Sequence, residues 1–289
     1  MSLASNAFFI GADIVRCSDC GLVYPHPRPS REQVDAFYRE SYYSYSGIKG
    51  ALARRLKLYY SGLRGRHQYR WIMKALDSSG RRSPGSGAPR VLEVGCGYGR
   101  LLEHFHNSGW EVQGIEPGED CASYTARKFA SAATGGARQG EAVFHGTFNE
   151  FEPTDGVTFD LIVLSHVFEH FIAPEEVIKR LEKLLAPGGS IFFELPNGRA
   201  GHYIETSYRL VPDFYFFSVE NFSSFVGLHG LETVRTGHIE YQRLLPRYDD
   251  LGHAVNYAWW AVLDLFGVSC FREAGSGSIW LRALVRKQG

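Results

Sequence analysis

The segment Val91–Leu102, VLEVGCGYGRLL, predicts a buried strand, a tight turn and the first turn of a helix. Its three glycines, Gly95, Gly97 and Gly99, permit positive φ and let a ligand approach the bare backbone. The first amides of the helix that follows have no partners within the helix and face that ligand. The segment therefore predicts a cradle for a nucleotide-type ligand. The alternative is an ordinary strand-turn-helix connection.

The spacing of the glycines limits the class of ligand that the turn can bind. A dinucleotide fingerprint, G-x-G-x-x-G, requires a glycine at position 100, where this chain has Arg100. The segment instead reads E-x-G-x-G-x-G, with Glu93 two residues before the first glycine. An anionic Glu93 repels a diphosphate and attracts an ammonium or sulfonium group. A cationic nucleoside is therefore favoured over a dinucleotide.

A second acidic residue, Glu116, stands at the C-terminal end of the next predicted strand, Glu111–Ile115. It follows Glu93 by twenty-three residues. That is close to the spacing at which an acidic residue of nucleotide-binding α/β folds accepts both ribose hydroxyls. Gly114 and Pro117 flank Glu116 and shape a turn, so we predict that Glu116 is a ribose ligand.

Composition excludes several classes of protein. The 289 residues suffice for one large or two modest domains, and the formal net charge of zero gives no global sign of a nucleic-acid binder. Five cysteines, an odd number without a dense pattern, fit a reducing compartment better than a disulfide framework. No secretory signal and no apolar run of membrane-spanning length is evident. We therefore expect a cytoplasmic protein without a transmembrane segment.

Four segments in order carry a family resemblance. VLEVGCGYGRLL and the strand ending at Glu116 are followed by FDLIVL at 159–164 and LLAPGGSIFFELPN at 184–197. Together they resemble the class I S-adenosylmethionine (SAM) dependent methyltransferases, particularly the small-molecule, ubiquinone-biosynthesis-like and sugar methyltransferase groups. The resemblance implies a Rossmann-like, doubly wound α/β fold. Its mostly parallel sheet would have seven strands with an antiparallel last strand, and a helical N-terminal extension would precede it.

The same resemblance implies the cofactor and its ligands. SAM would be the methyl donor and S-adenosylhomocysteine the product, held at the carboxyl ends of the strands. Phe148 could pack on the adenine ring and Asn149 could bond its edge, or either could be a core or capping residue. The expected donor-binding residues are Glu93, Gly95, Cys96, Gly97, Gly99, Glu116, Pro117, Phe148, Asn149 and Ser165.

The segment SHVFEHF at 165–171 supplies the catalytic candidates. By resemblance it lines the methyl-transfer site, and Glu169-His170 is a pair common in the ubiquinone-biosynthesis-like members. Histidine titrates near pH 7, so we predict His170 as the general base, with His166 in reserve and Glu169 beside them. The alternative is that His170 braces the following helix.

The acceptor is predicted to be a small molecule. The segment Pro212–Ser218 lacks a Glu-His pair that similar sugar C-methyltransferases carry, which disfavours C-methylation of a keto-sugar. O-methylation of a sugar, glycan precursor or similar hydroxylated metabolite is the first choice, and a lipid or quinone-like acceptor is the second. A non-catalytic SAM-binding scaffold is the alternative from another class. An NAD-dependent oxidoreductase is disfavoured by Arg100.

The N-terminal region contains one pair of cysteines, Cys17-x-x-Cys20, in a predicted hairpin. It resembles the second knuckle of a zinc ribbon whose first knuckle is missing. A structural zinc site requires four ligands, so we predict an unmetallated remnant unless His26 or a distant residue completes a site. The predicted domains are a hairpin and helix at 1–48, a basic helix and linker at 49–89, and a methyltransferase domain at 90–289.

Two further segments leave alternatives open. Residues 49–82 contain ten Lys or Arg and one acid, a surface that either pairs with the acidic remainder or attracts an anionic acceptor. Residues 242–277 form a predicted helical insertion that fits core packing, a homodimer contact, a lid or an interfacial membrane anchor. No nucleic-acid partner is expected.

Overall fold

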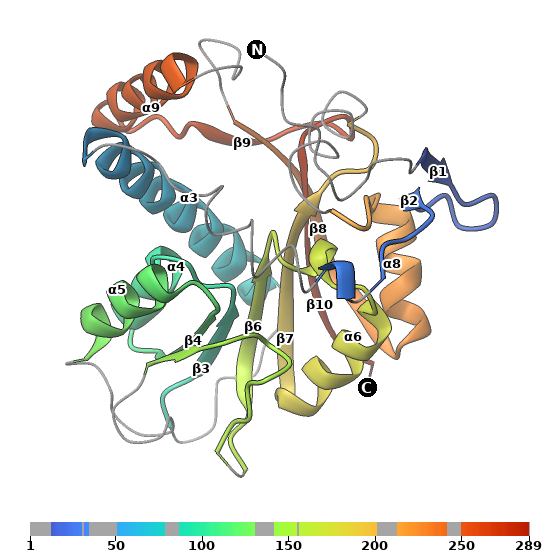
Figure 1. Cartoon of the computed structure of the whole chain (residues 1–289). Coiled ribbons are helices and arrows are strands. Elements are labelled where there is room, and N and C mark those ends of the chain that lie inside the picture. Colours follow the sequence, from blue (N-terminus) through green and yellow to red (C-terminus); the bar gives the residue numbers. More distant parts are fainter. Residues whose placement is uncertain are drawn as a thin grey trace.

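The computed structural model describes residues 13–30, 32–34, 51–78, 87–130, 142–154, 156–200, 213–241 and 250–288. Its centre is an eight-stranded sheet with the order β5-β4-β3-β6-β7-β10-β8-β9 (Figure 1). The strands are β3 Arg90–Val94, β4 Glu111–Glu116, β5 Val143–His145, β6 Phe159–Ser165, β7 Leu185–Pro196, β8 Leu231–Tyr241, β9 Phe271–Glu273 and β10 Trp280–Lys287.

The direction of the strands confirms the predicted fold class. Strands β3 to β7 pair in parallel, whereas β10 is antiparallel to both β7 and β8. The predicted number of seven strands is wrong, because β9 adds an eighth strand to the β8 edge. This three-residue strand lies within the segment predicted as a helical insertion. It is too short to give a recognisable apolar alternation.

Helices cover both faces of the sheet (Figure 1). Leu161 and Val163 of β6 belong to a core shared with α3 and α4, while Ile162 and Leu164 belong to a core shared with α6 and α8. Both faces of β6 are therefore buried, which explains its unbroken apolar sequence. The helices are α3 Ala51–Ser78, α4 Arg100–His106, α5 Glu119–Phe129, α6 Pro174–Leu184, α8 Val219–Leu228 and α9 Asp250–Leu265, with a 3-10 helix η3 at Phe168–His170.

The boundary between α6 and β7 differs from the prediction. The segment Ala186–Gly189 is predicted as a turn before the strand, but β7 begins at Leu185. Leu185 pairs with Phe159, and the register shifts before Leu161 pairs with Ser190. The turn residues are thus absorbed into an irregular start of the strand.

An N-terminal hairpin lies beside the segment that precedes α8. Strands β1 Asp13–Arg16 and β2 Val23–His26 pair antiparallel, and Val23 forms a β-bridge with Phe216. After this hairpin, Ser30 and Gln33 exchange the two hydrogen bonds of a capping box. The predicted linker and the aromatic loop before α8 lie largely outside the described residues, at 79–86 and 201–212. Within the described chain, no helix is both long and apolar enough to span a bilayer.

Candidate functional site

The turn between β3 and α4 forms the predicted cradle. Gly95, Gly97 and Gly99 have φ values of 71°, 51° and 62°. A Cβ on Gly95 would lie 2.6 Å from Val167 and one on Gly99 would lie 2.4 Å from Thr125, whereas one on Gly97 would meet nothing within 4 Å. Because Gly95 and Gly99 have no side chain, Val167 and Thr125 can pack closely against the turn. Gly97 exposes bare backbone to open space, as a ligand cradle requires.

Glu116 is fixed at the edge of this open space. At the end of β4, its carboxylate accepts hydrogen bonds from the backbone amides of Gly97 and Gly118, each at 2.8 Å. Burial raises the pKa of Glu116, and these two hydrogen bonds partly oppose that shift. A carboxylate has about four acceptor positions, so lone pairs remain for hydroxyl groups of a ligand. Pro117 is half-buried beside it.

Glu93 lies at 6% exposure on the adjacent strand, β3. Burial raises its pKa to about 8, although the charge of Arg64 and a hydrogen bond from the Leu102 backbone act in the opposite direction. Its Oε2 atom has no hydrogen-bond partner among the described residues. The sequence predicts an anionic Glu93, but in the absence of a cation this carboxyl is mostly neutral at pH 7. An unpartnered buried oxygen fits a bound cationic group.

The other residues expected to bind the methyl donor differ in their exposure to solvent. Cys96 is buried, and its sulfur would lie 2.6 Å from a Cβ on Gly114 of β4. Phe148 is also buried, between the Phe171 ring and the Arg180 guanidinium. Asn149 is exposed on the turn after β5. Cys96 is therefore packed behind the cradle, Phe148 is a core residue, and Asn149 is open to solvent.

Ser165, at the end of β6, joins a polar cluster that the sequence did not predict. Its hydroxyl accepts hydrogen bonds from Arg64 Nη2 at 2.5 Å and Gln68 Nε2 at 2.8 Å, both on α3. Arg64 and Gln68 also donate to Glu194 Oε1 of β7, at 3.2 and 2.7 Å. Arg64 was seen in the sequence only as one cation of a basic helix. Here it pairs with an acid of the sheet and brings a positive charge to the cradle.

Glu194 is fully buried and meets a second cation, Arg282 of β10. Arg282 Nε lies 2.5 Å from Glu194 Oε2, and the two residues are cross-strand neighbours. Burial opposes ionisation of Glu194, but Arg282 and Arg64 outweigh it and hold the pKa of Glu194 well below its ordinary value. The sequence carried a signal for this pair, since one charged residue interrupts each of two apolar strands, SIFFELP and WLRALV.

His166 lies between two carboxylates. Its Nδ1 is 3.3 Å from Glu169 Oε1 and its Nε2 is 3.4 Å from Glu194 Oε1. Burial and Arg64 lower its pKa, but the bonds to Glu169 and Glu194 outweigh them and leave the pKa raised. Its φ of 54° is in the left-handed region, which non-glycine residues seldom adopt. The His166 ring is thus held between two acidic side chains.

His170 has a different environment. Its Nδ1 lies 3.4 Å from Oδ1 of Asp213, a buried residue at the start of the described segment before α8. The next residue, Phe214, donates its amide to the Glu169 carbonyl at 2.9 Å and holds this segment against η3. Sequence reasoning missed Asp213, because it is forty-three residues from His170 and adjoins a segment with no regular pattern.

Glu169, His170 and Asp213 could also hold a metal ion. Their ligand atoms lie within 4.8 Å of one another, and this is the one group of three or more such residues in the described part of the chain. Glu169 is 1% exposed, and its Oε2 has no hydrogen-bond partner among the residues that the structure describes.

The two N-terminal cysteines, Cys17 and Cys20, are free thiols and join no such group within the described ranges. Hydrogen bonds from the Cys20 and Asp19 backbone lower the pKa of Cys17.

Comparison with known proteins assigns the family. The family described as Methyltransferase domain matches residues 60–236, which is more than half of the chain. The chain therefore belongs to this family, and its sheet order and glycine cradle make it a class I SAM-dependent methyltransferase.

Individual relatives are more distant. The chain is 28% identical over 129 residues to the ubiquinone biosynthesis O-methyltransferase of Aliivibrio fischeri (strain MJ11), covering 43% of this chain and 53% of the relative. It is 29% identical over 162 residues to the enzyme of the same description from Nitrosococcus oceani, covering 54% and 65%. The chain thus spans between half and two thirds of the length of these relatives.

A solved structure agrees in fold. Magnesium protoporphyrin IX methyltransferase from Synechocystis PCC 6803 with bound SAH superposes with a TM-score of 0.50 at 13% identity, covering 88% of this chain and 95% of that one. At this level of identity the likeness concerns the fold alone.

Proposed function

We propose that this methyltransferase binds SAM in the Gly95–Gly99 cradle and transfers its methyl group to a hydroxyl group of a small molecule. The observation that carries the proposal is the Glu116 carboxylate, fixed by two amides beside the open backbone of Gly97. In this reading Glu116 accepts the ribose hydroxyls. Glu93 and Arg64 face the charged amino-acid portion of the donor, with the unpartnered Glu93 oxygen turned to its cation.

SAM supplies an electrophilic methyl group on a sulfonium. The chain contributes orientation, which can supply roughly 7 to 11 kcal/mol of the barrier, and removal of the acceptor proton. Asp213 faces His170 Nδ1 and so favours the tautomer with its proton on that nitrogen. Nε2 is then free to take the hydroxyl proton as the acceptor oxygen bonds to carbon. His166 is the weaker candidate because two carboxylates already engage it.

For the acceptor, a sugar, glycan precursor or other hydroxylated metabolite is one candidate, and a lipid or quinone-like phenol is the other. The second is favoured by the names of the relatives above, which are ubiquinone biosynthesis O-methyltransferases. Uptake of labelled methyl into panels of sugars and of prenylated phenols separates the two.

The donor site is tested by calorimetry. We expect SAM and its demethylated product to bind in the micromolar range, with NAD not binding and Glu116→Ala losing at least one decade of affinity, about 1.4 kcal/mol. Unchanged SAM affinity in Glu116→Ala would reject this donor site. Donor binding without methyl uptake by either panel would favour a non-catalytic scaffold.

The catalytic pair is tested by His170→Ala and Asp213→Asn, with His229→Gln at the half-buried residue that follows α8 as the matched control. We expect His170→Ala to lower kcat by a factor on the order of 100 to 10,000 with unchanged SAM affinity. Asp213→Asn should give a smaller loss and a displaced pH profile. A loss below about threefold in His170→Ala would remove it from the base role. Activity abolished by EDTA and restored by Mg²⁺ would instead favour metal binding at Glu169, His170 and Asp213.

A further inference from the structure

An exposed apolar cluster lies at the C-terminal end of α9, outside the site just described. Leu265 and Phe266 are 84% and 79% exposed, and Val262 and Val268 are 42% and 44% exposed. These four residues, called the apolar tip below, are a majority of the seven large hydrophobic residues that are exposed in the described chain. Scattered exposed hydrophobics are ordinary, but a cluster on one protruding turn indicates an interaction surface.

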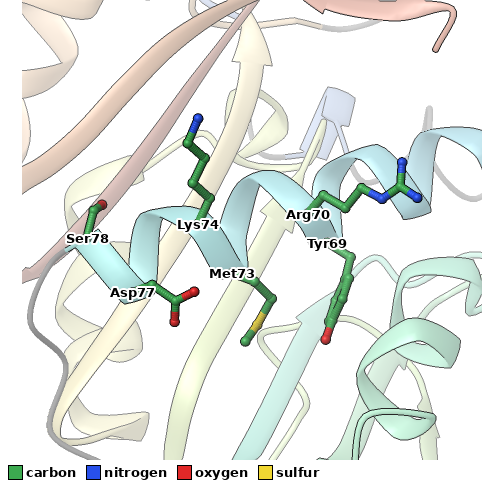
Figure 2. Close-up of a pocket in the computed structure, with 6 residues that line it drawn as sticks. All are labelled: Tyr69, Arg70, Met73, Lys74, Asp77 and Ser78. Carbon is green, nitrogen blue, oxygen red and sulfur yellow. The ribbon is translucent and has the colours of Figure 1, made fainter. Parts of the chain in front are cut away.

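A row of cations borders the apolar tip. Arg66, Arg70 and Lys74 follow one another at intervals of four residues along α3 and so lie on one face of the helix. Figure 2 shows Arg70 and Lys74 projecting to the same side of α3, and both line a groove of about 670 Å³ that Asp77 also lines. This face, called the cationic stripe below, retains charge: Arg66 pairs with Asp264 at 2.9 Å, whereas no ion pair is formed by Arg70 or Lys74 within the described chain.

The two surfaces are continuous. A second groove of about 140 Å³ is lined by Arg66 and Arg70 on one side and by Gly267 and Val268 on the other. Asp264 of α9 accepts hydrogen bonds from both Arg66 and Tyr59 of α3 and fixes the end of α9 against that helix. In Figure 1 the two helices lie side by side at the outer edge of the molecule. The apolar tip therefore has a fixed position beside the cationic stripe.

We propose that this α3–α9 surface docks on an anionic lipid bilayer. The apolar tip would enter the boundary between headgroups and acyl chains, and the cationic stripe would lie against lipid phosphates. An exposed aromatic and aliphatic cluster bordered by Arg and Lys is the pattern of peripheral membrane attachment. Since no described helix can span a bilayer, the attachment is peripheral. The inference does not depend on which acceptor is methylated.

Charge favours a bilayer over the other occupants of such a surface. A second copy of the chain docked through the same surface about a two-fold axis would bring Arg70 and Lys74 near their own equivalents, where like charges repel. A nucleic acid would pair with the cationic stripe but would leave Leu265 and Phe266 in water. A bilayer with anionic headgroups would bury the apolar tip and pair with the cationic stripe at the same time.

Co-sedimentation of the full chain with vesicles tests the proposal. We expect binding to vesicles that contain phosphatidylglycerol, weak binding to pure phosphatidylcholine, and weaker binding at high salt. The double variants Leu265→Ser/Phe266→Ser and Arg70→Glu/Lys74→Glu should each reduce partition at least roughly tenfold. The control is Leu228→Ser on α8, an isolated apolar residue that is also 84% exposed, and it should leave partition unchanged.

Circular dichroism and SAM affinity serve as controls for folding. We expect both to be unchanged in every variant, which would show that the fold is kept. The proposal would be overturned by equal partition of wild type and both double variants. It would also be overturned by self-association that Leu265→Ser/Phe266→Ser abolishes in a chain that does not bind vesicles. Salt-sensitive binding to an acidic protein or to RNA, without partition onto anionic vesicles, would equally reject it.

Discussion

Replacing Glu93 with Gln removes an ionisable group from the donor cradle while keeping its size. Burial raises the pKa of Glu93 from 4.5 to about 8 in the folded protein. Between these two values the folded state holds a proton that the unfolded chain has released. The free energy of unfolding of the wild type therefore falls as pH rises through this window, and Glu93→Gln removes the fall.

The expected size follows from the two pKa values. One pKa unit corresponds to about 1.36 kcal/mol, so between about pH 6 and about pH 8 the wild type should lose roughly 2 kcal/mol relative to Glu93→Gln. Above about pH 8 the group is ionised in both states and the difference becomes constant. The value rests on full burial of the carboxyl without a cation, which is the condition of the donor-free protein.

Urea unfolding at the two pH values, without donor, measures this difference. The matched control is Glu119→Gln, an exposed residue of α5 whose effect on stability should not change over the same window. If the difference in free energy of unfolding between wild type and Glu93→Gln is the same at both pH values, Glu93 does not have a raised pKa in the folded protein. Donor binding gives a second readout: because SAM is cationic, its affinity for the wild type should rise more than roughly tenfold over this range and stay constant in Glu93→Gln.

Two glycine substitutions test the packing of the site, and a third substitution, at Arg282, tests its buried ion pair. Gly95→Ala places a Cβ 2.6 Å from Val167 at positive φ and should cost about 2 to 4 kcal/mol in urea unfolding. Gly97→Ala meets no atom within 4 Å and should cost only about 1 kcal/mol of stability, yet weaken SAM binding in calorimetry. The reverse order of stabilities would show that the open side of the turn has been misassigned. Arg282→Met leaves the buried Glu194 with Arg64 as its remaining cation and should cost about 3 kcal/mol in urea unfolding, and the added Glu194→Gln should recover part of that loss.

Much of the fold could be predicted because its signals are local. The predicted strand Glu111–Ile115 matches β4 to within one residue, since Pro117 bounds it on the C-terminal side. The short β9 could not be predicted, because three residues carry no period and their pairing with β8 is set by tertiary contacts. The start of β7 lies earlier than its residue types suggest. Pro187 and the two glycines after it are typical of turns, but Leu185 before them already pairs with β6, and the pairing resumes at Ser190.

The arrangement of the candidate donor residues was partly predictable, where chemistry and spacing coincide. Glu116 does bond the glycine turn through Gly97, although the sequence did not reveal that burial raises the pKa of Glu93 to about 8. Asp213 and Arg64 reach the site from distant segments, and no local pattern marks either of them. Their roles depend on packing between elements, which a single sequence does not display.

The ion pair of Glu194 has a consequence for the order in which the enzyme is made. Arg282 is separated from Glu194 by 88 residues, so a ribosome completes β7 well before it completes the partner strand β10. Until then a nascent chain has a carboxylate that lacks its main counter-charge and is costly to bury. Burial of Glu194 is thereby coupled to synthesis of β10. A chain interrupted before this strand would present its glycine loop but not an assembled catalyst.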